Sequence, residues 1–302
     1  MSNGGPFDRV ALGASGITVS RLAWGMWRFQ GNDLRHARTL VDAAIEAGIN
    51  LFDTADIYGF NGRDGFGDAE ILLGRLFVAD PGLRRHLVLA SKSGITPGVP
   101  YDSSADYLVA ACEASLRRLG TDHLDLFQIH RPDVLTHPAE VARALESLLA
   151  SGKVRSVGVS NYTPTQTAAL LGHLRVPLAS LQPELSPLVL DPLTDGTLDL
   201  AMQHGCSVLA WSPLAGGRLG TPGDDERAQR VCAELDAQAE RRGVSRAAAA
   251  YSWIMAHPAG IVPIVGSQQP GRVREAAAAY QVEWTRADWY RVLVASRGVA
   301  LP

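Results

Sequence analysis

Short apolar runs alternate with longer amphipathic segments along almost the whole chain. The short runs are rich in Val, Leu, Ile and Phe, which is typical of buried strands, and the longer segments carry apolar residues at the three- and four-residue spacing of a helix. The predicted strands are Leu22–Gly25, Asn50–Asp53, Leu87–Ser91, Leu124–His130, Ser156–Ser160, Ser180–Glu184, Ser207–Trp211 and Ile261–Val265. The predicted helices are Asp33–Ala47, Asp68–Phe77, Ser104–Leu119, Pro138–Ala150, Thr163–Leu174, Thr197–His204, Arg227–Arg242, Ser245–His257 and Pro270–Ala279.

This succession of strand and helix predicts one closed barrel. Because no long linker or shift in composition separates the units, eight parallel strands are expected to close into a (β/α)8 TIM barrel, with residues 1–302 forming a single domain. A hairpin made by Arg9–Leu12 and Thr18–Ser20 is expected to close the barrel floor, and Arg286–Ala295 predicts an extra helix at the C-terminal end. Ser104 and the pair Thr163-Pro164 indicate helix starts.

The longest irregular segments follow strands two, three and seven. They are Gly59–Gly67, Ser93–Ser103 and Ser212–Glu226. All three lie on the face where the parallel strands end, and long loops on that face of a barrel usually bind or cover a ligand.

Composition excludes several classes of partner. The chain has 302 residues, 46% of them hydrophobic and 20% charged, which is enough for a large core. Its formal net charge of -3 and scattered basic residues predict no nucleic-acid partner. Met1–Asp8 has no leader pattern, and no apolar stretch reaches the roughly 18 residues of a membrane helix, so no membrane association and a cytoplasmic location are expected. Three cysteines without metal spacing, Cys112, Cys206 and Cys232, are expected to be buried reduced thiols.

Four reactive side chains follow predicted strands. Asp53, Tyr58, Lys92 and His130, below called the tetrad, fall just beyond three of the apolar runs. Strand ends on one face of a parallel barrel bring distant residues together, so these side chains are expected to form one site. Lys92 is conspicuous because only two of the 28 basic residues are lysine, and a lysine pKa can be shifted by burial.

The tetrad suits proton transfer to or from a carbonyl oxygen. A tyrosine with an ordinary pKa near 10 needs a neighbouring cation that stabilises its phenolate, and Lys92 is the candidate. Asp53 is expected to pair with Lys92, and His130 to hydrogen-bond the carbonyl oxygen of a substrate. Taken singly, each residue is equally compatible with a turn, cap or packing role, so the interpretation depends on the group as a whole.

Four motifs resemble those of the aldo-keto reductase superfamily. They are Asn50–Gly59, Leu89–Lys92, Asp122–His130 and Gly152–Asn161, and the resemblance extends from about Val10 to the end of the chain. It implies an NADPH-dependent reductase in which a hydride passes from the nicotinamide to a carbonyl carbon while Tyr58 protonates the oxygen. Lys92, Asp53 and His130 would assist it.

The resemblance also implies where the cofactor NADPH/NADP+ binds. Ser160, Asn161 and Gln182 would hold the nicotinamide carboxamide, and Trp211 would stack on the ring in place of the more usual tyrosine. A Rossmann domain is not expected, because no Gly-x-Gly-x-x-Gly follows a strand. The segment from Ile264 into the following helix is instead a natural anion site. The remaining residues implied as cofactor contacts are Gly25, Met26, Ser212, Leu214, Gly216, Arg218, Gly266, Ser267, Arg272 and Glu275.

Within this set, Ser267 and Arg272 would contact the 2′-phosphate and Glu275 the adenine. The loop after strand seven, from Ser212 to Arg218, would embrace the pyrophosphate. Family members commonly carry asparagine after that glutamate, whereas this chain has Ala276, which weakens the expected adenine contact.

Substrate recognition is encoded only weakly. Trp27, Phe60 and Tyr101 are predicted to wall an apolar or aromatic pocket, with Trp24, Met26 and Phe66 nearby in sequence. The chain ends soon after its last predicted helix, so an open pocket and broad reduction of aldehydes or ketones are expected. The expected partner is a small carbonyl compound, and the expected state is a monomer or weak homo-oligomer.

Other functions stay open from the residues alone. A Schiff-base aldolase would use Lys92 as its nucleophile, with Asp53 and Tyr58 as accessory groups. A non-catalytic NADPH-binding regulator is also compatible with the resemblance. A metal-dependent hydrolase is disfavoured, and no metal is expected, because His123, His130 and His137 lack the spacing of metal ligands.

Overall fold

A closed barrel of parallel strands forms the centre of the protein. The computed structural model describes residue 5 and residues 7–302. Within these residues, eight strands close on themselves in the order β10-β11-β12-β3-β4-β5-β8-β9, and all the pairs between them are parallel. The strands are β3 (Ala23–Gly25), β4 (Leu51–Asp53), β5 (Val88–Ser93), β8 (Leu126–Ile129), β9 (Val157–Ser160), β10 (Ser180–Gln182), β11 (Ser207–Ala210) and β12 (Val262–Val265). The predicted TIM barrel is confirmed.

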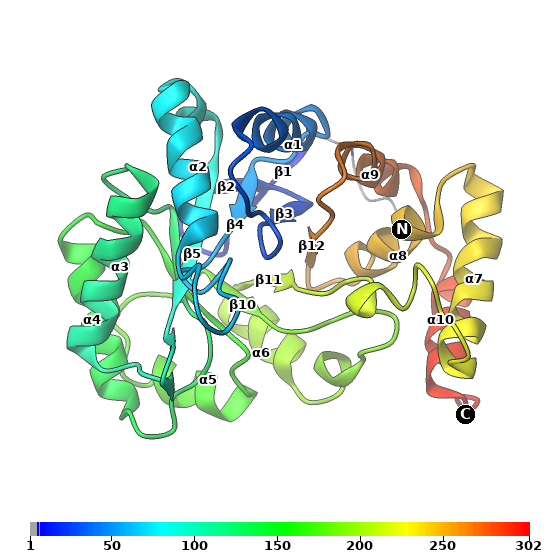
Figure 1. Cartoon of the computed structure of the whole chain (residues 1–302). Helices are drawn as coiled ribbons and strands as arrows, with labels where there is room; N and C mark the ends of the chain where they lie inside the picture. The colour runs from blue at the N-terminus through cyan, green and yellow to red at the C-terminus, as the bar shows by residue number, and fades with distance from the viewer. Residues whose placement is uncertain (1–4, 6) are drawn as a thin grey trace.

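Helices surround the barrel in chain order. Figure 1 shows α1, α2, α3, α4, α5, α6, α8 and α9 following one another around the strands, while α7 and α10 lie together on one side. Their bounds are α1 (Leu34–Glu46), α2 (Asp68–Ala79), α3 (Ala105–Leu119), α4 (Pro138–Ala150), α5 (Pro164–Leu171), α6 (Thr197–His204), α7 (Glu226–Arg242), α8 (Arg246–Met255), α9 (Pro270–Glu275) and α10 (Arg286–Arg297). Short 3-10 turns lie at Leu83–His86, Asp191–Leu193, Ala215–Gly217 and Ala276–Gln281.

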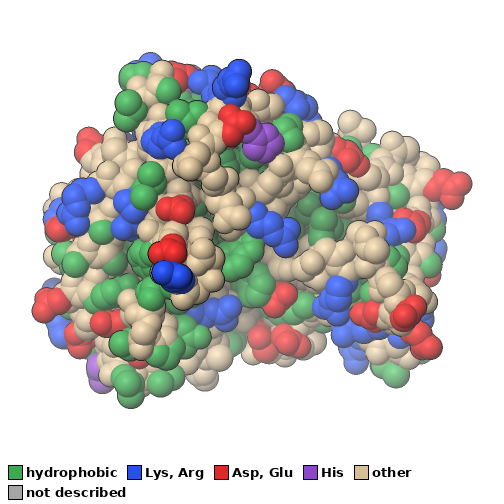
Figure 2. Space-filling model, in the orientation of Figure 1, with side chains coloured by type: hydrophobic (Ala, Val, Ile, Leu, Met, Phe, Trp, Pro, Cys, Tyr) green, Lys and Arg blue, Asp and Glu red, His purple; other side chains and the backbone are tan. Residues whose placement is uncertain are grey.

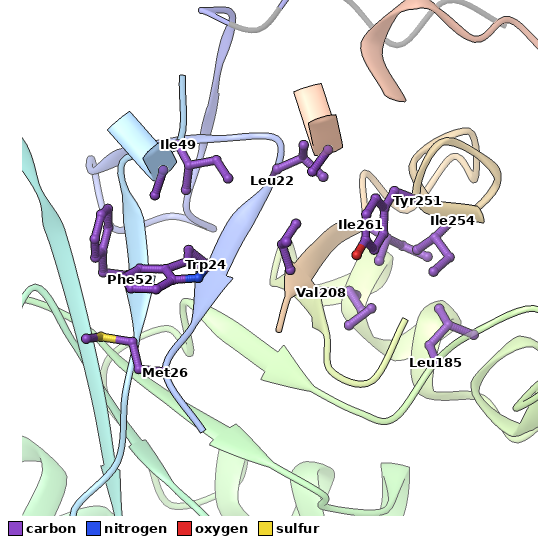
Figure 3. Close-up of a cluster of buried hydrophobic side chains, with 14 of the residues drawn as sticks. Leu22, Trp24, Met26, Ile49, Phe52, Leu185, Val208, Tyr251, Ile254 and Ile261 are labelled. Carbon is purple, nitrogen blue, oxygen red and sulfur yellow. The ribbon is translucent and has the colours of Figure 1, made fainter. Parts of the chain in front are cut away.

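Side chains alternate along each strand between the barrel interior and the helical layer. In β4, Leu51 lies inside the barrel, whereas Phe52 packs in the outer core between strands and helices. Figure 3 shows Phe52 beside Trp24, with Met26 next to them, and the rings of Trp24 and Phe52 meet edge to face at 5.3 Å. This alternation leaves every second strand position free to carry a polar group into the interior.

The N-terminal hairpin closes the barrel floor, as predicted. Strands β1 (Arg9–Ala11) and β2 (Thr18–Ser20) pair antiparallel, and Leu12 and Val19 beside them pack against the residues inside the barrel. At the turn, a Cβ on Gly13 would lie 2.5 Å from the carbonyl oxygen of Ala179, so the turn approaches the barrel too closely for any side chain.

The strand-three loop is more regular than its sequence indicates. Strands β6 (Ile95–Thr96) and β7 (Val99–Tyr101) form a small antiparallel hairpin inside a segment that was expected to be irregular. Gly94 and Gly98 have positive φ angles there, and only glycine adopts these readily. The hairpin escapes prediction because such short strands leave no periodic signal.

Helix starts are partly as predicted. Thr163 and Gln166 form a capping box with Pro164 in the first turn, which confirms that start of α5. Ser104 precedes α3 but its side chain makes no capping bond. Glu140 replaces it, because its carboxylate accepts a hydrogen bond from the Ala105 amide at 3.0 Å.

The surface and the cysteines add little that suggests a macromolecular partner. Acidic and basic side chains are interspersed over the face shown in Figure 2. The three cysteines are buried and free, as predicted. No helix within the described residues is long and apolar enough to cross a membrane. Of the N-terminal segment Met1–Asp8 used above, residues 1–4 and 6 lie outside the described part.

Candidate active site

The tetrad meets at the carboxyl ends of three neighbouring strands. Asp53 ends β4, Lys92 lies in β5, and His130 follows β8, while Tyr58 comes from the loop after β4. The ammonium of Lys92 donates to Asp53 Oδ2 at 2.6 Å and to the carbonyl oxygen of Thr54 at 2.9 Å. Its Nζ lies 4.9 Å from the centroid of the Tyr58 ring, and the rings of Tyr58 and His130 are 5.7 Å apart.

The protonation states within this group follow from burial and charge. Burial disfavours the Lys92 ammonium, but the charges and hydrogen bonds of Asp53 and Tyr58 together outweigh burial and raise the pKa of Lys92. Burial also raises the pKa of Tyr58, with Lys92 opposing the rise. Burial first, and then the charges of Lys92 and Arg131, hold the pKa of His130 well below its usual value. At neutral pH the group therefore contains an ammonium, a neutral phenol and a neutral imidazole.

The effect on Tyr58 differs from the sequence-based expectation in one respect. A nearby cation was expected to favour the phenolate, and Lys92 does act in that direction. The low polarity around the ring is the larger effect, so the pKa of the phenol lies above its ordinary value. The neutral phenol is thus strongly preferred, and it holds a proton that it can donate.

Two buried amides hold the second oxygen of Asp53. Gln182 Nε2 donates to Asp53 Oδ1 at 3.0 Å, and Gln128 Nε2 lies 3.4 Å from the same oxygen. Gln128 in turn accepts a hydrogen bond from Ser180 Oγ at 3.0 Å. Sequence reasoning missed Gln128 and Ser180. One signal was available for Gln128: it is a glutamine between apolar residues of a strand, and the alternation of side chains along that strand directs it into the barrel.

A second network connects the neighbouring strands. Asn161, which has a positive φ of 61°, donates from Nδ2 to the backbone carbonyl of His130 at 3.0 Å. Its side-chain oxygen accepts from Trp211 Nε1 at 3.0 Å. Ser160 Oγ donates to the backbone carbonyl of Gln182 at 2.9 Å. Four residues predicted to hold a nicotinamide therefore lie side by side along one rim of the barrel.

The loop after β11 contains several residues in left-handed conformations. Ser212, Gly216 and Gly217 have positive φ angles, and the amide of Gly216 donates to Ser212 Oγ at 2.8 Å. Arg218 lies in the same loop and contacts Asp225 at 3.4 Å. Leu214 is half-buried and packs against the core, so its side chain mainly fixes the loop.

The segment after β12 presents an unpaired cation. Gly266 is exposed, and a Cβ added there would meet no atom within 4 Å. Arg272 is exposed and makes no ion pair in the part of the chain that the structure describes, whereas Arg274 pairs with Glu46. Glu275 is exposed as well. Ala276 is buried in the core, so its side chain is not available for an adenine contact.

Some residues expected to contact ligands are core residues instead. The side chain of Met26 is fully buried with Trp24 and Phe52 (Figure 3), which corrects its assignment to a ligand-facing wall. Gly25 is also buried, and a Cβ there would lie 2.7 Å from Ile264. Its carbonyl oxygen accepts from Gln268 at 3.2 Å. The reason is register, because Trp24 and Met26 alternate into the outer core, whereas Gly25 lies toward Ile264 inside the barrel.

A cleft opens beside Tyr58. Trp27, Arg28, Gln30, Gly59 and Phe60 line a cavity of about 170 Å³. The Trp27 indole is 60% exposed and packs edge to face on the Tyr58 ring at 5.4 Å. Two of the three residues predicted to wall a pocket are therefore in place. The third, Tyr101, lies on the exposed strand β7 and does not line this cleft.

Behind the tetrad lies a buried acidic pair that sequence reasoning did not identify. Glu70 is fully buried, and its two oxygens accept from Ser91 Oγ at 2.6 Å and Arg118 Nε at 2.7 Å. Asp56 is also fully buried, and neither of its carboxylate oxygens has a hydrogen-bond partner within residues 5 and 7–302. Burial, and next the charge of Glu70, raise the pKa of Asp56 well above its usual value.

Comparisons with known proteins give a family and several relatives. The model of the Aldo/keto reductase family matches residues 21–293. The chain is 57% identical over 96% of its length to a 6-dehydroglucose reductase of Novosphingobium aromaticivorans, of which it covers 96%. It is 37% identical to a 6-dehydroglucose reductase of Agrobacterium fabrum, with 96% and 98% of the two chains covered. A thermostable aldo-keto reductase solved with the inhibitor epalrestat has the same fold, with a TM-score of 0.81 at 23% identity, over 95% and 99% of the chains.

Replacing Asp56 by Asn is expected to stabilise the protein increasingly as pH rises. The raised pKa means that folded Asp56 keeps a proton that the unfolded chain has lost above about pH 4, so stability falls as pH rises through this window. Asn has no such proton. The advantage of the variant should grow by up to about 1.4 kcal/mol per pH unit. Thermal unfolding from pH 4 to pH 8 measures it.

Asp64→Asn is the matched control, because that carboxylate is exposed beside Arg63. Its effect should be small and nearly independent of pH. A constant difference between Asp56→Asn and wild type across the range would contradict the assignment of a protonated Asp56.

Proposed function

The chain belongs to the aldo/keto reductase family, and from that premise we propose that it uses NADPH to reduce the aldehyde of a sugar to an alcohol. The observation that carries this proposal is the buried Lys92–Asp53 ion pair beneath the ring of Tyr58. Together they keep a neutral phenol next to a fixed cation. Such a phenol can give its proton to a carbonyl oxygen, because the cation stabilises the phenolate that remains.

The residues present fit the proposed cofactor. Trp211 offers a flat ring beside Asn161, and the loop around Gly216 turns its backbone amides through left-handed conformations. Arg272 carries an exposed charge without an internal partner among the described residues. An unpaired guanidinium of this kind suits the 2′-phosphate of NADPH. When bound, NADPH supplies the hydride for the carbonyl carbon.

The chain's own residues carry the proton. Tyr58 donates to the carbonyl oxygen, and the charge left on its oxygen is offset by Lys92. Asp53 keeps Lys92 charged, since an unpaired ammonium at this depth would lose its proton. His130 is neutral and orients the carbonyl oxygen by a hydrogen bond. The phenolate then regains its proton from solvent, which restores the starting state.

The substrate class follows from the relatives. Two proteins named 6-dehydroglucose reductase match nearly the whole chain, one of them at 57% identity. We propose a hexose with an aldehyde at C6 as the substrate. Addition of a hydride to that carbon and a proton to its oxygen converts the aldehyde to a primary alcohol and gives glucose.

The site argues against a Schiff-base aldolase. An amine must be uncharged to attack a carbonyl carbon. Lys92 instead has a raised pKa and an ion-pair distance of 2.6 Å to Asp53, so it stays protonated. Turnover assays distinguish a reductase from a non-catalytic NADPH-binding regulator.

Tyr58→Phe is expected to abolish reduction while leaving NADPH binding within about twofold of wild type. Phenylalanine keeps the ring packing but has no proton to give, and a lost general acid costs roughly 10²–10⁴-fold in kcat. Loss of NADPH absorbance with 6-dehydroglucose measures the rate, and fluorescence titration measures the affinity. An unchanged rate in the variant would exclude Tyr58 as the proton donor.

Gln128→Leu is expected to lower kcat about tenfold and to shift its pH profile, with NADPH affinity unchanged. The variant removes an amide beside Asp53 and the acceptor of Ser180, which loosens the carboxylate that holds Lys92. Gln128→Asn should recover part of the rate. If the pH profile does not move in Gln128→Leu, the residue contributes to packing only.

Arg272→Ala is expected to weaken NADPH binding about 10- to 100-fold and NADH binding much less. Only NADPH has the 2′-phosphate, and a charge-assisted hydrogen bond contributes roughly 1.5–3 kcal/mol. Equilibrium titration with both cofactors gives the ratio. Arg274→Ala is the control, since that side chain pairs with Glu46. Equal losses for the two cofactors in Arg272→Ala would remove the residue from the phosphate site.

A further inference from the structure

The cleft beside Tyr58 has two kinds of wall. Trp27 and Phe60 form aromatic walls, and Arg28 and Gln30 form polar ones. It lies beside the tetrad, because its wall residue Trp27 packs on the Tyr58 ring at 5.4 Å. Its volume of about 170 Å³ is below the roughly 300 Å³ at which sites for drug-sized ligands begin, so it suits a small polar molecule.

The Trp27 indole is both exposed and held in place. Trp27 is 60% exposed although tryptophan is mostly buried in folded proteins. Its ring is nevertheless positioned, since it packs on Tyr58 at a centroid distance of 5.4 Å. An aromatic face held beside a proton donor can pack against the C–H groups of a ring-shaped substrate.

The polar walls have unused hydrogen-bonding capacity. The side chains of Arg28 and Gln30 are exposed and make no hydrogen bond or ion pair in the described part of the chain. A guanidinium offers five N–H donors in a planar fork, and an amide offers two donors and an acceptor. This combination matches hydroxyl groups, which both donate and accept. One guanidinium without a second cation suits a neutral molecule better than a doubly charged phosphate.

The loop that carries Arg28 and Gln30 is held in place by a buried residue between them. Phe29, between Arg28 and Gln30, is buried and meets the Trp24 ring at 5.4 Å. Its amide donates to the carbonyl of Met26 at 3.0 Å. Burial of Phe29 therefore turns the residues on either side of it outward, toward the cleft. A preorganised site of this kind loses less conformational entropy when a ligand binds.

The facing wall is fixed by glycine. Gly59 has a φ of 101°, and a Cβ there would lie 2.8 Å from the carbonyl oxygen of Gly65 and 2.7 Å from Asp68. The loop after Tyr58 is thus closed tightly against the start of α2. Both walls of the cleft are supported by buried or close-packed backbone.

We propose that this cleft is the subsite for the hydroxylated ring of the sugar aldehyde, with Arg28 and Gln30 as its specificity-determining residues. The inference rests on the proposed function and extends it. Trp27 packs against the apolar face of the sugar ring, and Arg28 and Gln30 bind its hydroxyl groups. The aldehyde carbon, outside the ring, then lies toward Tyr58.

The test compares substrates that differ in their hydroxyl groups. kcat/KM is measured with 6-dehydroglucose, with hexanal, and with succinic semialdehyde as an anionic aldehyde, for wild type, Arg28→Met and Gln30→Leu. Arg28→Met should lower kcat/KM for the sugar about 10- to 100-fold and Gln30→Leu about 3- to 10-fold, because each removes hydrogen bonds to the substrate. The value for hexanal should change less than twofold. Arg63→Met, an exposed arginine in the next loop, is the matched control.

A second measurement does not depend on turnover. Glucose, the product of the proposed reaction, is titrated calorimetrically into wild type and both variants in the presence of NADP+. Binding to wild type that weakens at least tenfold in Arg28→Met supports the subsite, even if the variants turn over slowly. Equal losses for sugar and hexanal, or a larger loss for succinic semialdehyde than for the sugar, overturn it.

The two proposals fail in different ways. If wild type reduces no sugar aldehyde but reduces hexanal, the proposed substrate is wrong, and glucose that does not bind removes the subsite as well. If wild type reduces 6-dehydroglucose and the variants keep the wild-type ratio of sugar to hexanal, the proposed function stands and the subsite is wrong.

Discussion

A fully buried lysine is the constraint on which the rest of the site depends. The Lys92 ammonium has no exposed surface, and a buried charge is tolerated only when it is paired and hydrogen-bonded. Asp53 supplies the charge, and the Thr54 carbonyl supplies a further acceptor. Because Asp53 is itself buried, its other oxygen needs donors, which explains the amides of Gln128 and Gln182. One lysine on β5 thus requires polar side chains from three other barrel strands, β4, β8 and β10.

The buried polar side chains around Lys92 form two separate groups. The inward group carries the tetrad and pairs Lys92 with Asp53 and Asp53 with two amides, whereas Glu70 and Asp56 belong to a second group of buried polar side chains. Glu70 is paired there, but Asp56 has no hydrogen-bond partner among the described residues and stays protonated. Asp56 lies in the same short loop as Tyr58. The stability of the protein is consequently expected to depend on pH, although the raised pKa of Tyr58 keeps its phenol neutral.

The sequence could predict the repeated strands and helices of the barrel and the reactive residues that follow its strands. The strand and helix alternation gave all eight barrel strands, and four reactive residues after apolar runs indicated the tetrad. Gln128 and Ser180 were not predicted, because a single polar residue inside a strand does not reveal its partner across the barrel. Met26 was expected to contact the cofactor, yet its side chain is buried in the outer core, because regular alternation along β3 directs Trp24 and Met26 outward. The hairpin β6–β7 is too short to produce a periodic signal.

The polar cleft lies in the loops after the strands and not in the barrel interior. Inside the barrel the hydrogen bonds of Asp53 keep the charge of Lys92 paired, so a change there alters the surroundings of the Tyr58 ring. Loops after the strands are free of that demand. Arg28 and Gln30 flank a buried anchor, Phe29, and contribute nothing to the tetrad's hydrogen bonds. Under the proposed function, substrate choice could therefore change at these two exposed positions while the geometry of the tetrad remains constant, as expected of a barrel whose loops carry the binding residues.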